Sequence, residues 1–338
     1  MRSARASQIV LAGGSGQVGT LLARHFHSIG HSVSVLSRRE SISPWRVVHW
    51  DGMTLGDWIT ELDGADVVIN LAGRSVNCRY NAANRREILE SRTGPTRLIG
   101  EAIARLAIPP NLWINASTAT IYRHALDRAM DESTGEIGGK EIDAPETWRF
   151  SIDVATSWER AFFASKTPAT RKVALRSAIV LSPDRGGAFD LLLRLVRFGL
   201  GGAAGSGNQF VSWIHERDFV QAVEFLIAHE ELDEAVNVAS PGPLPNREFM
   251  RALRKAWGTG IRLPATEWML AIGAFFLRTE TELILKSRRV VSKRLVDAGF
   301  EFEFPAWPDA ATDLVERWRN VQQVSPVRGT SKNSRIAA

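Results

Sequence analysis

A glycine-rich turn is the first feature of this chain that could do chemistry. The apolar run 8–12 leads into GGSGQVG, from Gly13 to Gly19, and a helical pattern over residues 18–29 follows. Such a turn cradles a dinucleotide pyrophosphate, because glycines let the backbone approach it and the helix N-terminus carries partial positive charge. Glycine strings also occur in ordinary turns, but the flanking strand and helix favour a dinucleotide site. We predict cofactor contacts from Gly13, Ser15, Gly16, Gln17, Val18 and Gly19.

The end of the next expected strand, residues 31–36, indicates which dinucleotide binds. Ser37-Arg38-Arg39-Glu40 follows it, with no carboxylate at the strand tip. A carboxylate there would bind the ribose hydroxyls of NAD, whereas arginine accommodates the 2′-phosphate of NADP. A solvated basic turn neutralised by Glu40 is the alternative. We expect NADP as the cofactor, with contacts from Ser37, Arg38, Arg39, Asp51, Leu71, Ala72, Gly73 and Ser117.

Composition limits the classes of function. The 338 residues are 44% hydrophobic and 23% charged, as in soluble globular proteins, and the net charge of +5 is modest. No basic helix face is interleaved with aromatic residues, so we expect no nucleic-acid partner. Cys78 is the only cysteine and the histidines lack metal-ligand spacing, so we expect neither intrachain disulfides nor a metal site.

The distribution of apolar segments along the chain indicates the cellular compartment. No apolar segment precedes the first strand, and the longest apolar run, residues 269–277, is too short to span a bilayer. We expect a cytoplasmic protein without a membrane partner, in which residues 269–277 form a buried helix; a lipid-facing or partner-facing helix is the alternative.

Further apolar strands, expected at 46–49, 67–71, 112–116 and 172–180, alternate with helical patterns such as residues 85–105. This alternation predicts an α/β fold: a Rossmann-type, doubly wound parallel sheet with a smaller, mostly helical C-terminal lobe. Ligands of such sheets bind beyond the carboxyl ends of the strands. We expect an NADP-binding domain over residues 1–183, a mixed segment that returns to the sheet and forms the substrate cleft over 184–240, a helical lobe over 241–318 and a disordered tail over 319–338.

The chain resembles extended short-chain dehydrogenases/reductases, specifically an atypical epimerase-like family with a C-terminal domain of unknown function. Matching segments run through the chain in order: AGGSGQVG, VVINLAGRSV, ILESRTGPTRLIGEAI, INASTATIY, LRSAIVLSP, GSGNQFVSWIHERDF, PLPNREFMRAL and KRLVDAGFEF. The resemblance implies a Rossmann-type sheet that carries a substrate lobe.

One catalytic motif of that superfamily is missing. Its mechanism uses a Tyr-x-x-x-Lys pair, in which the lysine lowers the tyrosine pKa for proton transfer. The only tyrosines, Tyr80 and Tyr122, have no lysine four residues later. Alignment on the Trp158-Glu159 dipeptide places Ser151 and Ala155 at the pair's positions.

Three residues remain as catalytic candidates. Ser117 ends a strand where the superfamily hydrogen-bonds the reacting oxygen; a strand-end cap is the alternative. Tyr122, in the loop over the site, either acts as an acid or packs against the cofactor. By resemblance, Arg92 stands where the superfamily has asparagine near the reactive end of the cofactor, which suggests an electrostatic role; pairing with Glu87 is the alternative.

We therefore expect an NADP(H)-dependent oxidoreductase or epimerase that acts on a small polar or anionic substrate, with nucleotide-linked compounds included. Arg79 is expected to approach the same cleft. The glycine-rich stretch up to Gly207, followed by Asn208, Gln209, Trp213 and His215, is expected to form the opposite wall. A homodimer is one expected assembly. The alternative is a non-catalytic NADP-binding protein that reports cofactor state to a partner.

Overall fold

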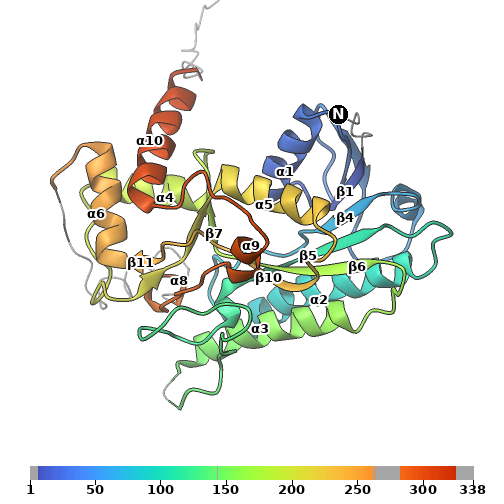
Figure 1. The fold of residues 1–338 in the computed structure, drawn as a ribbon, viewed down its shortest axis with the longest axis horizontal. Helices are drawn as coiled ribbons and strands as arrows, with labels where there is room; N and C mark the ends of the chain where they lie inside the picture. The colour runs from blue at the N-terminus through green and yellow to red at the C-terminus, as the bar shows by residue number, and fades with distance from the viewer. Residues whose placement is uncertain (1–6, 143, 262, 264–281, 325–338) are drawn as a thin grey trace, which may run out of the picture.

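A parallel sheet with helices on both faces forms the larger part of the protein (Figure 1). The computed structural model describes residues 7–142, 144–261, 263 and 282–324. Within this part of the chain, seven parallel strands lie in the order β10-β6-β5-β4-β1-β2-β3, so the strand order reverses between β1 and β4. A crevice opens at such a reversal, at the carboxyl ends of the strands. The predicted Rossmann-type sheet is confirmed. The strands are β1 (Gln8–Ala12), β2 (Ser32–Ser37), β3 (Arg46–His49), β4 (Val67–Asn70), β5 (Leu112–Thr118), β6 (Arg171–Ser177) and β10 (Glu234–Val238).

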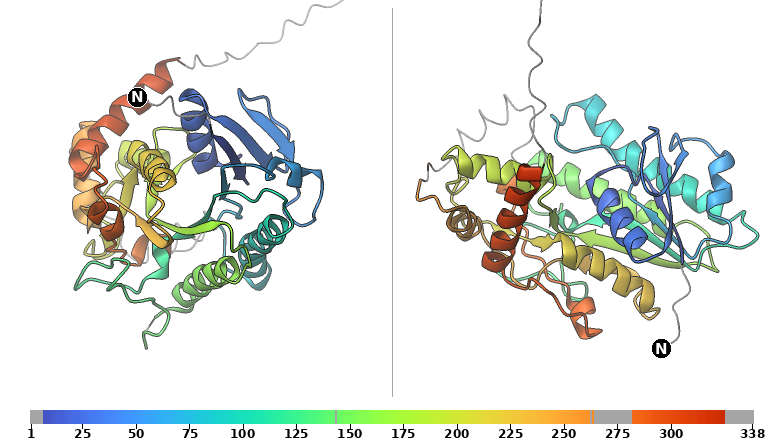
Figure 2. Two further views of the ribbon diagram at one scale, coloured as in Figure 1. Left: turned by 45° about the vertical axis from the view of Figure 1, so that its right-hand side comes forward. Right: turned by 90° about the horizontal axis from the view of Figure 1, so that it is seen from above.

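Side chains alternate between two apolar layers. Ile9 and Leu11 of β1 pack into the core beneath helices α1 and α5, whereas Val10 and Ala12 pack against α2 and α3. Figures 1 and 2 show these two pairs of helices on opposite sides of the sheet. Both faces are therefore buried, which is why the strands are apolar throughout. The covering helices are α1 (Gln17–Ser28), α2 (Ala82–Ile103), α3 (Glu146–Phe163) and α5 (Glu216–Ala228); short 3-10 helices lie at η1 (Asp57–Glu61) and η2 (Ala119–Ile121).

The strand expected over residues 172–180 is two strands. Strand β6 ends at Ser177, and Ala178 donates its backbone N–H to Val238 of β10. The chain then leaves the large sheet as β7 (Ile179–Leu181), which pairs with β9 (Trp213–His215). The expectation of one continuous strand is wrong, because the pairing partner changes at this point.

A third apolar core holds the C-terminal lobe together. It combines residues of α4, α6 and α10, and Trp307 stacks on Phe249 with ring centroids 4.0 Å apart. Helix α10 continues to Val324, so residues 319–324 are helical and the expectation of a disordered tail from 319 is wrong there. The remaining elements are α4 (Ala188–Arg197), β8 (Phe210–Val211), β11 (Leu244–Pro245), α6 (Asn246–Trp257), α8 (Glu282–Leu285), α9 (Lys293–Asp297) and α10 (Trp307–Val324).

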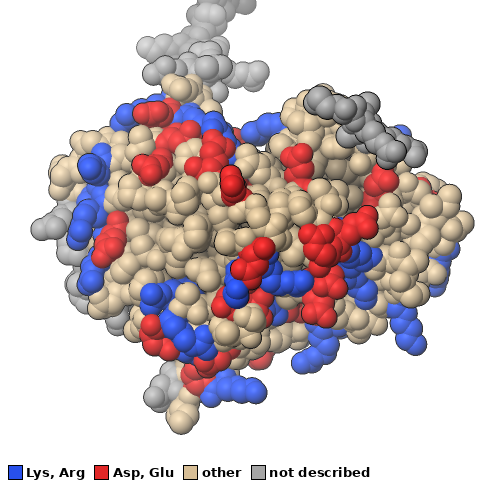
Figure 3. Space-filling view, viewed as in Figure 1, with Lys and Arg blue, Asp and Glu red and all other residues tan. Residues whose placement is uncertain are grey.

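Two further observations concern the charged surface and the hydropathy of the helices. On the face drawn in Figure 3, basic and acidic residues are interspersed rather than separated into one basic stripe. No helix in the described ranges is both long and apolar enough to cross a membrane. The predicted buried helix over residues 269–277 lies outside the described residues.

Candidate functional site

The glycine turn after β1 has the geometry that dinucleotide binding requires. Gly13 has φ +71°, and a Cβ there would lie 2.8 Å from the backbone of Ala72, so the turn closes against the end of β4. A Cβ at Gly19 would lie 2.3 Å from the carbonyl oxygen of Gly14, so only glycine lets the helix follow this turn. A Cβ at Gly16, the N-cap of α1, would meet nothing within 4 Å, and no side chain caps the helix. The uncapped amides and the open space fit a pyrophosphate.

Gln17 adds a polar group that fits the same ligand. Its Nε2 is buried and has no hydrogen-bond partner among the described residues. A buried N–H group without an acceptor costs about 1–3 kcal/mol, which a phosphate oxygen would offset. A Cβ at Gly187 would lie 2.1 Å from this nitrogen, so the start of α4 closes over the turn. Gly187 was not among the predicted site residues, although the Gly186-Gly187 pair after an apolar strand could have indicated it.

The tip of β2 presents two arginines to solvent. The buried Ser37 hydroxyl accepts a hydrogen bond from the backbone N–H of Arg39 (3.1 Å). Arg38 and Arg39 are exposed, and neither forms an ion pair with a carboxylate in the described part of the chain, Glu40 included. The alternative of a basic turn neutralised by Glu40 is therefore not supported, and both guanidinium groups remain available to a phosphate.

Asp51 lies after β3 and organises its own turn. The backbone N–H groups of Met53 and Thr54 donate to Oδ1 (2.7 and 2.9 Å), and the Thr54 hydroxyl donates to Oδ2 (2.6 Å). These hydrogen bonds, that of the Thr54 side chain foremost, lower the pKa of Asp51. The carboxylate has a structural role here, and its contact with the cofactor stays a prediction.

Ser117 belongs to a buried ionic network beneath the strand ends. Its hydroxyl donates to Glu159 Oε1 of α3 (2.6 Å), and Arg176 of β6 holds both oxygens of that carboxylate (2.8 and 2.7 Å). Ser117 is only 6% exposed. Because its proton is engaged by Glu159, the geometry favours a structural role, and its predicted role toward substrate stays untested.

Tyr122 lies at the other end of the same network. Its hydroxyl donates to Asn237 Oδ1 (2.9 Å) and accepts from Arg176 Nη1 (2.9 Å), and the ring is buried. Burial raises the pKa of Tyr122, which opposes a role as a ready proton donor. The geometry favours packing over acid catalysis.

Thr118 carries a hydroxyl at the end of β5 and was not among the predicted site residues. Side chains of consecutive strand residues point to opposite faces, so Thr118 points away from the Glu159 side that Ser117 contacts. It is partly exposed, and its Oγ1 accepts from the backbone N–H of Thr120 (3.1 Å). Its place next to Ser117 could have indicated it.

Arg92 is held at the end of β4 by a polar cluster between α2, α3 and the sheet. One turn after it, Thr96 accepts hydrogen bonds from Asn70 Nδ2 (3.0 Å) and from Trp158 Nε1 (2.9 Å). The Arg92 guanidinium lies over the Trp158 ring, 5.3 Å from its centroid. A Cβ at Gly73 would lie 3.4 Å from Arg92 Cγ and Cζ, so the side chain lies against the predicted cofactor segment.

Among the described residues, the Arg92 guanidinium has no acidic partner. Its Nη1 donates to the carbonyl of Ile88 (2.9 Å), and no carboxylate of the described residues pairs with it. Glu87, the predicted alternative partner, pairs with Arg74 instead. Burial lowers the pKa of Arg92 to about 10, so it remains charged at neutral pH. A cation in this state is suited to receive an anion.

Ser151, which the alignment places at the position of the missing tyrosine, contacts the C-terminal part of the chain. Ser151 donates to Glu282 Oε2 (3.1 Å), and Glu282 also accepts from Arg288 Nη2 (2.8 Å). Arg288 Nε donates to Thr120 Oγ1 (3.0 Å), and Lys286 Nζ donates to the Thr120 carbonyl (2.7 Å). No residue of this C-terminal group was among the predicted site residues, because nothing local in its sequence indicates proximity to α3.

Two predicted wall residues lie elsewhere. Trp213 is fully buried in the C-terminal core, and His215 is fully buried with a ring nitrogen 3.0 Å from Asp313. The expectation that they line the cleft is wrong, because strand β9 turns both side chains into protein. Arg79 is partly buried, and its role stays a prediction.

Known proteins similar to this chain match nearly its whole length. Epimerase family protein SDR39U1 of Bos taurus is 32% identical and covers 91% of this chain and 99% of its own. A crystal structure of the human SDR39U1 protein (isoform2) with NADPH is 28% identical, with a TM-score of 0.79 over 91% of this chain and 99% of that chain. A UDP-N-acetylglucosamine 4-epimerase from Bacillus cereus shares the fold, with TM-score 0.70 at 18% identity over 93% of this chain and 100% of its own.

Family models agree with these relatives. Residues 9–142 match the NAD dependent epimerase/dehydratase family, and residues 265–314 match a domain of unknown function, DUF1731. The chain belongs to the epimerase family of SDR39U1-like proteins, within the NAD dependent epimerase/dehydratase family and with a C-terminal DUF1731 domain.

Proposed function

We propose that this protein is an NADP(H)-dependent oxidoreductase or epimerase that acts on a small polar substrate with an acidic group, nucleotide-linked compounds included. The observation that carries the proposal is the unneutralised Arg92 guanidinium against Gly73, one residue beyond the Ala72 backbone on which the Gly13 turn closes. A dinucleotide seated in the glycine turn and an anion at Arg92 would therefore be neighbours.

The residues available to the cofactor divide into two groups. The amides around Gly16 and the Gln17 side chain would hold the pyrophosphate, and Arg38 and Arg39 would hold a 2′-phosphate. The NADPH bound by the human relative supports this choice over NAD. When bound, the cofactor supplies or accepts a hydride.

The remaining residues would orient the substrate. Arg92 would bind its acidic group, and Thr118 is better placed than Ser117 to hydrogen-bond its reacting oxygen, since the Ser117 proton is engaged by Glu159. With Ser151 and Ala155 at the pair positions, proton transfer needs another carrier than a Tyr-Lys pair.

An NADPH assay tests this proposal. NADPH fluorescence gives the cofactor affinity, and oxidation is then followed with carbonyl compounds that differ only in an acidic group. We expect the unmodified protein to turn over the acidic compounds. In Arg92→Gln we expect an unchanged NADPH affinity and a turnover loss of about 100-fold, which corresponds to a rise of a few kcal/mol in the activation free energy. Arg97→Gln, an exposed change on the same helix, is the matched control.

A non-catalytic NADP-binding role is the second candidate. The observation that favours it is the pair of substitutions at Ser151 and Ala155, where Ala155 is fully buried and carries no proton-transfer group. Tight NADPH binding without oxidation by any acidic or neutral carbonyl compound, or by nucleotide sugars, would favour this role over the enzyme.

A further inference from the structure

Two basic side chains of the C-terminal part of the chain hold Thr120, in the turn that follows β5. Lys286 Nζ donates to the Thr120 carbonyl oxygen (2.7 Å), and Arg288 Nε donates to Thr120 Oγ1 (3.0 Å). Arg288 is itself fixed, because it also pairs with the buried carboxylate of Glu282 (2.8 Å). Both oxygens of Thr120 are therefore held by residues that lie 166 and 168 positions further along the chain.

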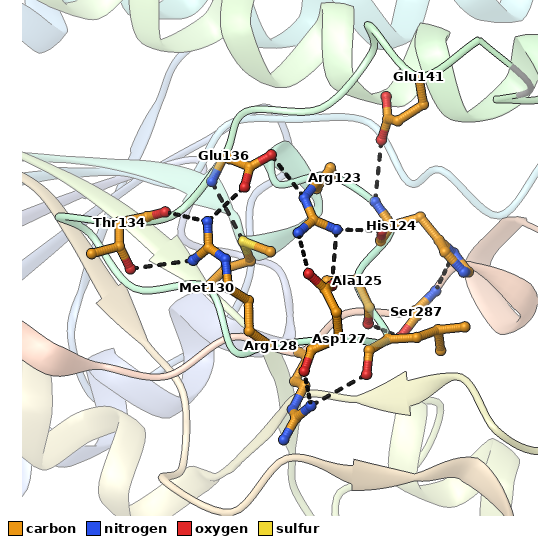
Figure 4. Close-up of polar contacts among 12 residues, drawn as sticks. Arg123, His124, Ala125, Asp127, Arg128, Met130, Thr134, Glu136, Glu141 and Ser287 are labelled. Carbon is orange, nitrogen blue, oxygen red and sulfur yellow. Dashed lines mark hydrogen bonds and ion pairs between the residues drawn. The ribbon is translucent and has the colours of Figure 1, made fainter.

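The backbone between these two side chains is anchored on two sides. The Ser287 N–H donates to His124 Nδ1 (3.1 Å), and the Ser287 hydroxyl donates to the Ala125 carbonyl (2.6 Å; Figure 4). On the other side, the Phe210 N–H of β8 donates to Ser287 Oγ (2.8 Å), and the Arg288 N–H donates to the Phe210 carbonyl (2.9 Å). The side chains that hold Thr120 therefore extend from a segment fixed between the loop after β5 and strand β8.

Thr120 in turn determines where the Thr118 hydroxyl lies. Thr118 ends β5 and is the N-cap of η2, and its Oγ1 accepts a hydrogen bond from the Thr120 N–H (3.1 Å). A hydroxyl has one donor and two acceptor positions, and the Thr120 N–H occupies one of the acceptor positions. Among the residues that the structure describes, no acceptor binds the Thr118 hydroxyl proton, which is therefore available to a ligand.

A purely structural role does not account for the Lys286 amine. Lys286 is 1% exposed, and burying an amine with few partners costs free energy that an apolar side chain of similar length does not. Glu141 and Glu282 favour its charge electrostatically, but within the described part of the chain neither carboxylate forms an ion pair with it. The hydrogen bond to the Thr120 carbonyl is the specific contact that this amine makes.

We propose that Lys286 and Arg288 are positioning residues for the reaction. By fixing Thr120 they hold its N–H against Thr118 Oγ1, and the Thr118 hydroxyl proton is thereby directed at the reacting oxygen of the substrate. The inference rests on the proposed function for this substrate contact. A donor fixed in advance stabilises negative charge that develops on the oxygen, with no cost of reorganisation at the moment of reaction. The C-terminal segment therefore contributes to the rate rather than to substrate affinity.

NMR of Thr118 tests the positioning step without turnover. The full-length protein is labelled with carbon-13 and nitrogen-15 and saturated with NADP⁺, and three-bond couplings between the Thr118 methyl carbon and the backbone report χ1. We expect a single χ1 rotamer in the unmodified protein. Lys286→Met keeps the length of the side chain and removes the donor. It should give couplings averaged over rotamers, and the Thr120 amide should exchange its hydrogen about tenfold faster or more.

A second variant probes the Arg288 contact, and a third is the control. Thr120→Val keeps the shape of the side chain and removes the oxygen that Arg288 contacts, while the ion pair of Arg288 remains. The Thr118 couplings should again be averaged. Lys172 is a partly buried lysine that donates to backbone carbonyls within residues 162–165, so Lys172→Met should leave the Thr118 rotamer unchanged.

Kinetics with the acidic carbonyl compounds show whether Lys286 acts through Thr118. Thr118→Val should lower kcat about 100-fold, because a donor to the reacting oxygen is lost. Lys286→Met should lower kcat about tenfold with an unchanged KM, because the donor is present but misplaced. The double variant should lose no more than Thr118→Val alone, since a positioning residue has no effect once the donor is absent.

A single fixed Thr118 rotamer in Lys286→Met or in Thr120→Val would overturn the role of the side chain that the variant probes. Additive losses of kcat in the double variant would overturn the action through Thr118. If Lys286→Met does not fold, Thr120→Val decides. If the unmodified protein oxidises NADPH with none of the compounds, the proposed function fails, whereas averaged rotamers in the variants still support the positioning of Thr118 by the C-terminal segment.

Discussion

The Ser151 hydroxyl of α3 donates a hydrogen bond to Glu282 Oε2 of α8, at a distance of 3.1 Å. Alignment on Trp158-Glu159 predicts Ser151 at the position of the tyrosine of the Tyr-x-x-x-Lys pair, and its partner lies 131 residues further along the chain. The C-terminal segment therefore contacts the residue of α3 that is expected at the position of the missing tyrosine. Glu282 belongs to the region that matches DUF1731, so this region is in direct contact with the larger domain.

Cofactor choice is the first prediction. Replacing Arg38 and Arg39 together with alanine should weaken NADPH binding by about 1.5–3 kcal/mol, because charge-assisted contacts to the 2′-phosphate are lost. NADH binding should barely change, since that cofactor lacks the phosphate. Fluorescence titrations of both cofactors measure this. Equal NADPH and NADH affinities in the unmodified protein would contradict the assignment.

The buried ion pair between Glu159 and Arg176 should be important for stability. Glu159→Gln leaves Arg176 buried without a carboxylate and should lower the free energy of unfolding by about 3–5 kcal/mol in urea titrations. Glu101→Gln, which breaks an exposed pair with Arg105, should cost less than about 1 kcal/mol. Similar losses in both variants would show that the network around Ser117 is not stabilising.

Tyr122→Phe distinguishes packing from acid catalysis. The phenylalanine keeps the ring but leaves Asn237 Oδ1 and Arg176 Nη1 without the hydroxyl that they contact. The free energy of unfolding should therefore fall by about 1–3 kcal/mol. NADPH affinity should be unchanged, and any turnover should keep its pH profile. A turnover loss of about 100-fold or more in a stable, NADPH-binding variant would restore the acid role.

His215 should make stability depend on pH. Burial lowers the pKa of His215 to about 4, despite the opposing effect of Asp313. Between pH 6.5 and pH 4 the unfolded chain binds a proton that the folded protein does not, so stability falls as pH falls through this range, by up to about 3 kcal/mol. Urea titrations across this pH range check the slope.

A pair of variants shows whether His215 causes the dependence of the unfolding free energy on pH. His215→Gln should reduce this dependence, whereas His49→Gln, at an exposed position on β3, should not. An unchanged slope in His215→Gln would assign the effect to other groups.

The sequence by itself determined the architecture around the cofactor. Strand, glycine turn and helix are encoded by local spacing, and Gly13 is required by a positive φ that few other residues adopt. Alternating apolar strands and helices predicted the parallel sheet, because both periodicities come from backbone geometry. Arg92 lies against Gly73, beyond the end of β4, and its predicted place near the reactive end of the cofactor stays a prediction.

Only the tertiary structure decided which polar groups form hydrogen bonds within the protein and which remain available to a ligand. Ser117 meets Glu159 across 42 residues, and Tyr122 meets Asn237 across 115, so neither engagement leaves a local pattern in the sequence. The Lys286 and Glu282 side chains contact Thr120 and Ser151 because the C-terminal segment packs on the loop after β5. Burial lowers the pKa of Lys286, and this burial depends on atoms contributed by distant parts of the chain, which local spacing does not encode.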